Sequence, residues 1–108
     1  MIPGAEPWSH DAGRHDAGGI VLVHGFGGTP ATFRRIAVAC AGAGLHVEVP
    51  LLPGHGTQVS DMVPTRWRDW TGEASNAYQR AATRSSKVVL GGQSMGASLA
   101  LWIALGHP

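Results

Sequence analysis

The chain has a single cysteine, Cys40, among its 108 residues, so no disulfide can form within it. Cys40 falls at an apolar position of a predicted helix, where a small core residue is expected rather than a reactive thiol. Charged residues make up only 14% of the sequence, and the net charge is +1. Neither nucleic acid nor an acidic membrane surface is therefore indicated as a partner.

Long apolar runs are also lacking. The longest, LALWIAL at residues 99–105, is far too short to cross a bilayer. The N-terminal residues MIPGAEPWSH have neither the basic start nor the apolar stretch of a signal peptide. We therefore expect no membrane span and a cytoplasmic location, and no pattern indicates a metal or an organic cofactor.

What the sequence does contain is a repeated alternation of strand and helix patterns. Residues 1–18 are expected to form an irregular arm with a short strand near residues 6–9. Residues 19–108 are expected to form a β-α-β-α-β-α core. Such an alternation predicts right-handed crossovers and a parallel sheet covered by helices, which is the α/β class in a three-layer α/β/α arrangement.

Three apolar runs predict the main strands, at residues 20–23, 45–49 and 87–90, and each is expected to be buried in the sheet. The first of them should lie in the middle, giving the order second–first–third. The second strand is followed by a loop of about fifteen residues, and loops of that length in compact domains are usually functional.

Helix signals follow each strand. Thr29 can cap the first helix, with Pro30 at its first position and Gly42 or Gly44 at its end. Its expected buried face is Phe33, Ile36, Ala37 and Cys40. Thr65 is expected to cap the second helix, whose buried face is Trp67, Trp70, Ala74, Ala77, Tyr78 and Ala81, with both tryptophans as core anchors. Gly106 is expected to end the third helix.

The stretch GGQSMGAS places Ser94 between Gly92 and Gly96, directly after a strand and before a helix. A strand that enters Gly-x-Ser-x-Gly and turns into a helix is a nucleophile elbow. The turn is tight enough that side chains two residues before and after the serine would clash. It raises the hydroxyl above the sheet edge and places helix N–H groups beneath a reacting carbonyl.

A second glycine-rich segment, HGFGGTP, ends the first main strand. In a parallel sheet its C-terminal end lies beside that of the Ser94 strand. The backbone N–H groups of Phe26 and Met95 can then point at one carbonyl oxygen, which makes an oxyanion hole. The alternative for HGFGGTP is a phosphate-binding loop, although neither Gly-x-x-x-x-Gly-Lys-Ser/Thr nor Gly-x-Gly-x-x-Gly is present. The alternative for the Ser94 turn is a plain glycine-rich β–α turn with an incidental serine.

These motifs, together with GAEPW, LPGHGT and TRWRDW, give the sequence a specific resemblance. It resembles the α/β-hydrolases, in particular the bacterial carboxylesterase and monoacylglycerol-lipase branch, over residues 4–108. The resemblance implies that Ser94 is the nucleophile and that Phe26 and Met95 supply the oxyanion amides. It also implies support of the oxyanion loop by His24 and Gly25 and of the elbow by Gly92, Gln93 and Gly96. The PGHG segment at residues 53–56 resembles a structural turn.

A serine nucleophile needs a base and an acid, and in these families they follow the serine in the order Asp or Glu, then His. After Ser94 the chain contains no acidic residue, and its only histidine is His107, beyond the predicted helix. Among earlier histidines, His24 and His55 are weak candidates for the base, whereas His10, His15 and His46 are expected in the arm or at the surface. The acidic candidates Asp61, Asp69 and Glu73 lie on the loop and helix after the second strand.

We therefore expect the N-terminal portion of an α/β-hydrolase that lacks the triad acid and base. The first hypothesis is a truncated serine ester hydrolase that forms an acyl-enzyme on Ser94. The second is a thioester or amide hydrolase, or an acyltransferase, on the same scaffold. The third is a non-catalytic remnant that binds acyl ligands or a partner chain. The unpaired edge of the third main strand is also expected to favour self-association.

Overall fold

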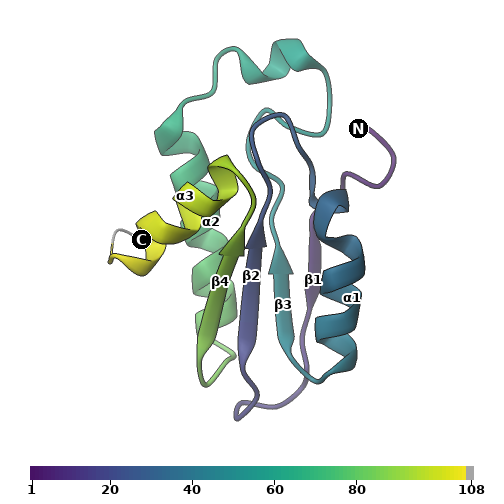
Figure 1. The fold of residues 1–108 in the computed structure, drawn as a ribbon, viewed down its shortest axis with the longest axis vertical. Coiled ribbons are helices and arrows are strands. Elements are labelled where there is room, and N and C mark those ends of the chain that lie inside the picture. Colours follow the sequence, from purple (N-terminus) through teal and green to yellow (C-terminus); the bar gives the residue numbers. More distant parts are fainter. Residues whose placement is uncertain (107–108) are drawn as a thin grey trace.

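The computed structural model describes residues 1–106, in which one sheet is flanked by helices (Figure 1). Its strands follow the order β1–β3–β2–β4. Their bounds are Trp8–His10 for β1, Gly19–Val23 for β2, His46–Val49 for β3 and Val88–Gly92 for β4. The predicted order of the three main strands is confirmed, because β2 pairs in parallel with both β3 and β4. The short strand of the arm begins two residues later than expected and pairs antiparallel with β3.

The helices cover both faces of this sheet, which confirms the α/β class. The 3-10 turn η1 (Pro30–Phe33) leads into α1 (Arg34–Gly42), and the 3-10 turn η2 (Val59–Met62) interrupts the long loop before α2 (Trp67–Ala82). The third helix, α3 (Met95–Ala104), follows β4 directly. Alternate residues of β2 point to opposite faces. Val21 and Val23 accordingly pack in the cluster of α2 and α3, whereas Leu22 packs in the cluster of α1.

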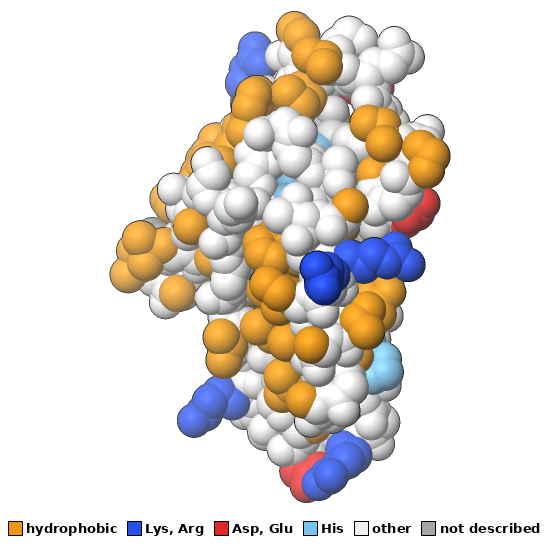
Figure 2. All heavy atoms as spheres, turned by 45° about the vertical axis from the view of Figure 1, so that its right-hand side comes forward, with side chains coloured by type: hydrophobic (Ala, Val, Ile, Leu, Met, Phe, Trp, Pro, Cys, Tyr) orange, Lys and Arg blue, Asp and Glu red, His pale blue; other side chains and the backbone are white. Residues whose placement is uncertain are grey.

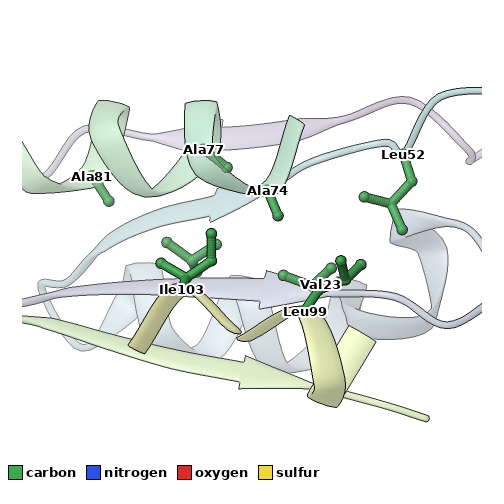
Figure 3. Close-up of a cluster of buried hydrophobic side chains, with 8 residues drawn as sticks. Val23, Leu52, Ala74, Ala77, Ala81, Leu99 and Ile103 are labelled. Carbon is green, nitrogen blue, oxygen red and sulfur yellow. The ribbon is translucent and has the colours of Figure 1, made fainter. Parts of the chain in front are cut away.

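The larger apolar cluster lies between the sheet and the α2–α3 layer (Figure 3). The helix α2 presents three buried alanines at steps of three and four residues, so its backbone can come close to the strands. They face Val23, Leu52, Leu99 and Ile103 in Figure 3. The surface view of Figure 2 shows hydrophobic side chains spread over much of one face with few charged groups between them, as the low charged fraction suggests.

The first helix keeps its predicted start but not its whole predicted face. Thr29 is the N-cap of η1, and its hydroxyl oxygen accepts the Ala31 N–H at 3.2 Å. Phe33 and Ala37 are buried and Cys40 packs half-buried against the same cluster, but Ile36 is 52% exposed. Phe33 closes the 3-10 turn, and the buried line then continues at Ala37 and Cys40. Ile36 lies off that line, so its predicted burial is wrong.

The start of α2 also differs from the prediction. Arg66, not Thr65, is the N-cap, and its N–H donates to the Asp69 carboxylate at 2.8 Å. The Thr65 hydroxyl instead donates to the Met62 carbonyl. Trp67 is 39% exposed and packs edge-on against Trp102, so it is not a core anchor. Trp70 is half-buried against the core, as expected of an anchor.

The strand β4 is less buried than predicted. It forms an edge of the sheet, and β2 is its only partner strand within residues 1–106. Val89 is 57% exposed in consequence.

A buried polar pair on β3 departs from the sequence prediction. His46 was expected at the surface, but it is 1% exposed. Its Nδ1 accepts the Ala12 N–H at 2.9 Å, and its Nε2 donates to the Arg14 carbonyl at 2.6 Å. Arm residues far away in sequence therefore enclose it. Its neighbour Glu48 is 2% exposed and is bound by Arg80 at 2.9 Å.

Candidate active site

Ser94 occupies a strained turn between β4 and α3. Its φ is 56° and its ψ is −122°, and it is the one non-glycine residue with positive φ in the described part of the chain. This region of backbone space is costly for any residue with a Cβ, and such strain is typical of functional sites. The side chain is exposed, and Ser94 is the N-cap of α3. Its hydroxyl therefore stands at the positive end of a helix dipole.

The two flanking glycines are required by close backbone contacts. A Cβ on Gly92 would lie 2.3 Å from the backbone carbon and oxygen of Gly96. A Cβ on Gly96 would lie 1.9 Å from the carbonyl oxygen of Val23. Gln93 ties the turn to β2 by donating its N–H to the same Val23 oxygen at 3.1 Å. The turn predicted from the sequence is thus present, and it is wedged against the end of β2.

The loop that follows β2 lies directly against this turn. A Cβ on Gly25 would be 3.1 Å from the Gln93 carbonyl oxygen and 3.2 Å from the Ser94 Cβ. Phe26 follows in the chain, and Met95 begins α3. Within residues 1–106 neither the Phe26 nor the Met95 amide donates a hydrogen bond to another protein group. The structure therefore brings two free backbone donors to the neighbourhood of the Ser94 hydroxyl.

His24 is fully buried beneath this loop, and both of its ring nitrogens are engaged. Nδ1 donates to the Gly25 carbonyl at 2.9 Å, and Nε2 accepts the Leu52 N–H at 3.1 Å. Burial lowers the pKa of His24 below its ordinary value, opposed by the bond to Gly25 and assisted by nearby His55. A neutral imidazole with no free nitrogen supports the loop but cannot take a proton from Ser94.

His55 lies in the PGHG turn, between two glycines with positive φ of 80° and 79°. It is 4% exposed, its Nδ1 donates to the Pro53 carbonyl at 3.0 Å, and its ring lies 5.1 Å from that of His24. The contacts of Leu52 with His24, and of His55 with His24 and Phe26, were not predicted from the sequence. The positive-φ glycines were the available signal for a tight turn, but not for its neighbour in space.

The remaining candidate bases and acids do not meet Ser94. No hydrogen bond joins the Ser94 hydroxyl to a histidine or carboxylate in the 1–106 region, and His107 lies outside the described residues. Asp69 caps α2, and Glu73 pairs with Arg80 at 3.3 Å.

Within residues 1–106 no group of three or more His, Cys, Asp or Glu side chains could hold a metal ion. None of the described helices has the length and apolar character needed to cross a membrane.

The fold matches a known family. The chain belongs to the alpha/beta hydrolase fold family, whose match covers residues 19–108. It is 40% identical over its whole length to the thermostable monoacylglycerol lipase of Bacillus sp. (strain H-257). It is also 30% identical, over 82% of its length, to the esterase YjfP of Escherichia coli (strain K12).

A solved structure has the same fold as this chain. It comes from work on LipS and LipT, two metagenome-derived lipolytic enzymes, and 96% of this chain superposes on it with a TM-score of 0.90 at 35% identity. The chain spans 42% and 40% of the lengths of the two curated relatives and 41% of the solved structure. The matched part is therefore about two fifths of those proteins.

Proposed function

We propose that this chain carries the nucleophile and the oxyanion hole of a serine hydrolase acting on carboxylic esters. The strained backbone of Ser94 is the observation that carries the proposal, because nothing in the packing of a plain β–α turn requires a serine at φ 56°. The similarity to a monoacylglycerol lipase and an esterase supports the ester substrate class. A short- or medium-chain acyl ester or a monoacylglycerol is the proposed substrate.

In the proposed reaction the Ser94 Oγ attacks the ester carbonyl carbon while a base takes its proton. The carbonyl oxygen becomes an oxyanion that accepts hydrogen bonds from the Phe26 and Met95 amides. The carbon–oxygen bond to the alcohol then breaks, and the alcohol leaves with the proton from the base. Water attacks the acyl-enzyme by the same route and releases the acid and free Ser94.

The base and acid of this reaction are proposed to come from polypeptide outside residues 1–106. His24 has both nitrogens occupied, and no histidine in that range bonds to the Ser94 hydroxyl. We propose that residues 1–108 are the nucleophile-bearing part of a single hydrolase domain. The cytoplasmic location expected from the sequence stays a prediction.

A non-catalytic acyl-binding role is the second candidate. One observation favours it: within residues 1–106 no hydrogen bond joins a histidine to the Ser94 hydroxyl. Thioester and amide hydrolysis or acyl transfer would use the same hydroxyl and amides, so substrate comparison must separate them from ester hydrolysis.

The experiment compares the chain alone with a chimera. In the chimera residues 1–106 replace the matching part of the Bacillus lipase, whose remaining residues are kept. With p-nitrophenyl butyrate we expect near-zero turnover from the chain alone and clear turnover from the chimera. Ser94→Ala should reduce the chimera's kcat by at least about 10³-fold. A chimera that folds but shows no Ser94-dependent turnover would refute the proposal in favour of the acyl-binding role.

Matched ester, thioester and amide substrates then define the reaction class. Esters should be preferred by the chimera. Rates within about tenfold for all three substrates, a difference of only about 1.4 kcal/mol in barrier, would remove the ester assignment.

A further inference from the structure

The carbonyl oxygen of Pro53 accepts two side-chain hydrogen bonds. His55 Nδ1–H donates to it at 3.0 Å, and Trp70 Nε1–H donates at 3.2 Å. A carbonyl oxygen offers two lone pairs, so both of its acceptor sites are filled. The His55 ring lies in the loop and the Trp70 ring on α2. The Pro53 carbonyl therefore fixes the two rings relative to each other.

Both rings meet Phe26 edge-on. The Phe26 ring centroid lies 5.8 Å from that of His55 and 5.8 Å from that of Trp70, with interplanar angles of 86° and 77°. Edge-to-face contacts of this kind are favourable and directional. Phe26 is 59% exposed, so burial does not hold it in place. The two perpendicular rings restrain it instead.

The other side of Gly25 is tied to the same segment. His24 accepts the Leu52 N–H at 3.1 Å and donates to the Gly25 carbonyl, which also accepts the Gly28 N–H at 2.9 Å. The oxyanion loop is thus bound to residues 52–55 both before and after Gly25. The Phe26 amide has no acceptor of its own within residues 1–106, so its direction depends on these neighbours.

The second ring nitrogen of His55 indicates that the imidazole does more than fill space. Nε2 is buried and has no hydrogen-bond partner among the described residues. An enclosed acceptor without a donor is unfavourable. Phenylalanine would fill the same space without that cost, so the contribution that favours an imidazole here is its Nδ1–H bond to Pro53.

We infer that His55 and Trp70 are positioning residues, which act through the Pro53 carbonyl and the Phe26 ring to orient the Phe26 amide toward the oxyanion. This inference rests on the proposed function, since it gives the Phe26 amide the role of an oxyanion donor. Neither residue touches the reacting atoms.

The first test measures the mobility of the Phe26 amide by ¹⁵N relaxation in the 108-residue chain. His55→Phe and Trp70→Phe each keep a ring and remove one N–H bond to Pro53, and the double variant removes both. Trp67→Phe is the matched control, because Trp67 begins the same helix but packs on Trp102. We expect an order parameter near about 0.85 in the parent and control and below about 0.6 in the double variant. Amides of β2 should stay rigid in all five proteins, which would show that the fold is intact.

The second readout is kinetic and uses the chimera with the Bacillus lipase. The double variant should lower kcat by about 10²-fold with little change in KM, because only the oxyanion contact is misplaced. An unchanged Phe26 order parameter and unchanged kcat in the double variant would overturn the inference, while Ser94-dependent turnover would still uphold the proposed function. If the parent chimera has no such turnover, the proposed function fails, and the order parameters alone decide whether His55 and Trp70 fix the amide.

Discussion

A Cβ placed on Gly96 would lie 1.9 Å from the carbonyl oxygen of Val23, well inside any tolerated contact. Gly96 is in the first turn of α3, and Val23 ends β2. The turn at Ser94 is therefore in main-chain contact with the central strand, and only a hydrogen atom fits on the Gly96 Cα at this contact.

Gly96→Ala should therefore lower the free energy of unfolding by at least about 3 kcal/mol, because backbone rather than a flexible side chain must move. Gly72→Ala is the matched control: Gly72 lies in α2, and its added Cβ would meet nothing within 4 Å. That substitution should stabilise the chain by about 0.5–1 kcal/mol. Urea unfolding measures both, and equal effects of the two substitutions would contradict the close contact.

The parts of the fold that the sequence predicted are those set by local pattern. The apolar run in β2, the Thr29 cap and the Gly-x-Ser-x-Gly turn each carry their signal within a few residues. The errors involve distant contacts. His46 is buried by Ala12 and Arg14 of the arm, which lie 34 and 32 positions away in the sequence. No sequence pattern around His46 predicts these contacts. Trp67 shares the helical period of α2 but lies in its first turn, where it meets Trp102 rather than the sheet.

The candidate site divides in the same way. Ser94, its glycines and the loop after β2 were predicted because a strand followed by a tight turn leaves few choices of residue. The Leu52 N–H bond to His24, the Trp70 ring contact with Phe26 and the Trp70 bond to the Pro53 carbonyl were not predicted, since they join three separate segments through a backbone amide, a carbonyl and an indole. Backbone amides, carbonyls and indoles occur in every sequence, so they do not indicate which segments they will join in the folded chain.

The buried His24 predicts a pH dependence of stability. Burial lowers its pKa in the folded state, so the unfolded state binds more protons near neutral pH. The stability it provides is fully present above the ordinary histidine pKa of about 6.5 and is lost as pH falls below that value toward the folded-state pKa. The free energy of unfolding should therefore decrease between pH 7.5 and 5.

His24→Gln should lower stability at pH 7.5 and flatten this dependence, because no buried imidazole remains to be protonated at that position. His15→Gln is the control, since His15 is exposed, and it should leave the slope unchanged. Urea unfolding at half-unit pH steps gives the three curves. Parallel curves for the parent and His24→Gln would show that another group causes the loss.

The strain at Ser94 predicts an unusual order of stabilities among its variants. Ser94→Gly and Ser94→Ala both remove the hydroxyl, but only glycine adopts φ 56° and ψ −122° without a Cβ penalty. Ser94→Gly should therefore be more stable than Ser94→Ala by about 1 kcal/mol. The pair Ser98→Gly and Ser98→Ala, at an exposed position inside α3, should show the opposite order by about 0.5–1 kcal/mol. The same order at both positions in thermal unfolding would refute strain at Ser94.

The open edge of β4 predicts self-association of the chain. An edge strand presents unpaired N–H and carbonyl groups to any second strand, and Val89 on this edge is 57% exposed. Sedimentation of the parent chain should show a reversible dimer or larger species. Val89→Lys should shift the population toward monomer, because a charge on an exposed edge opposes strand pairing. Val38→Lys is the control: Val38 is 53% exposed but lies on the helix α1 and not on β4, so association should persist. A parent that sediments as a monomer over the whole concentration range, or an equal effect of both lysines, would show that β4 is not the surface through which copies meet.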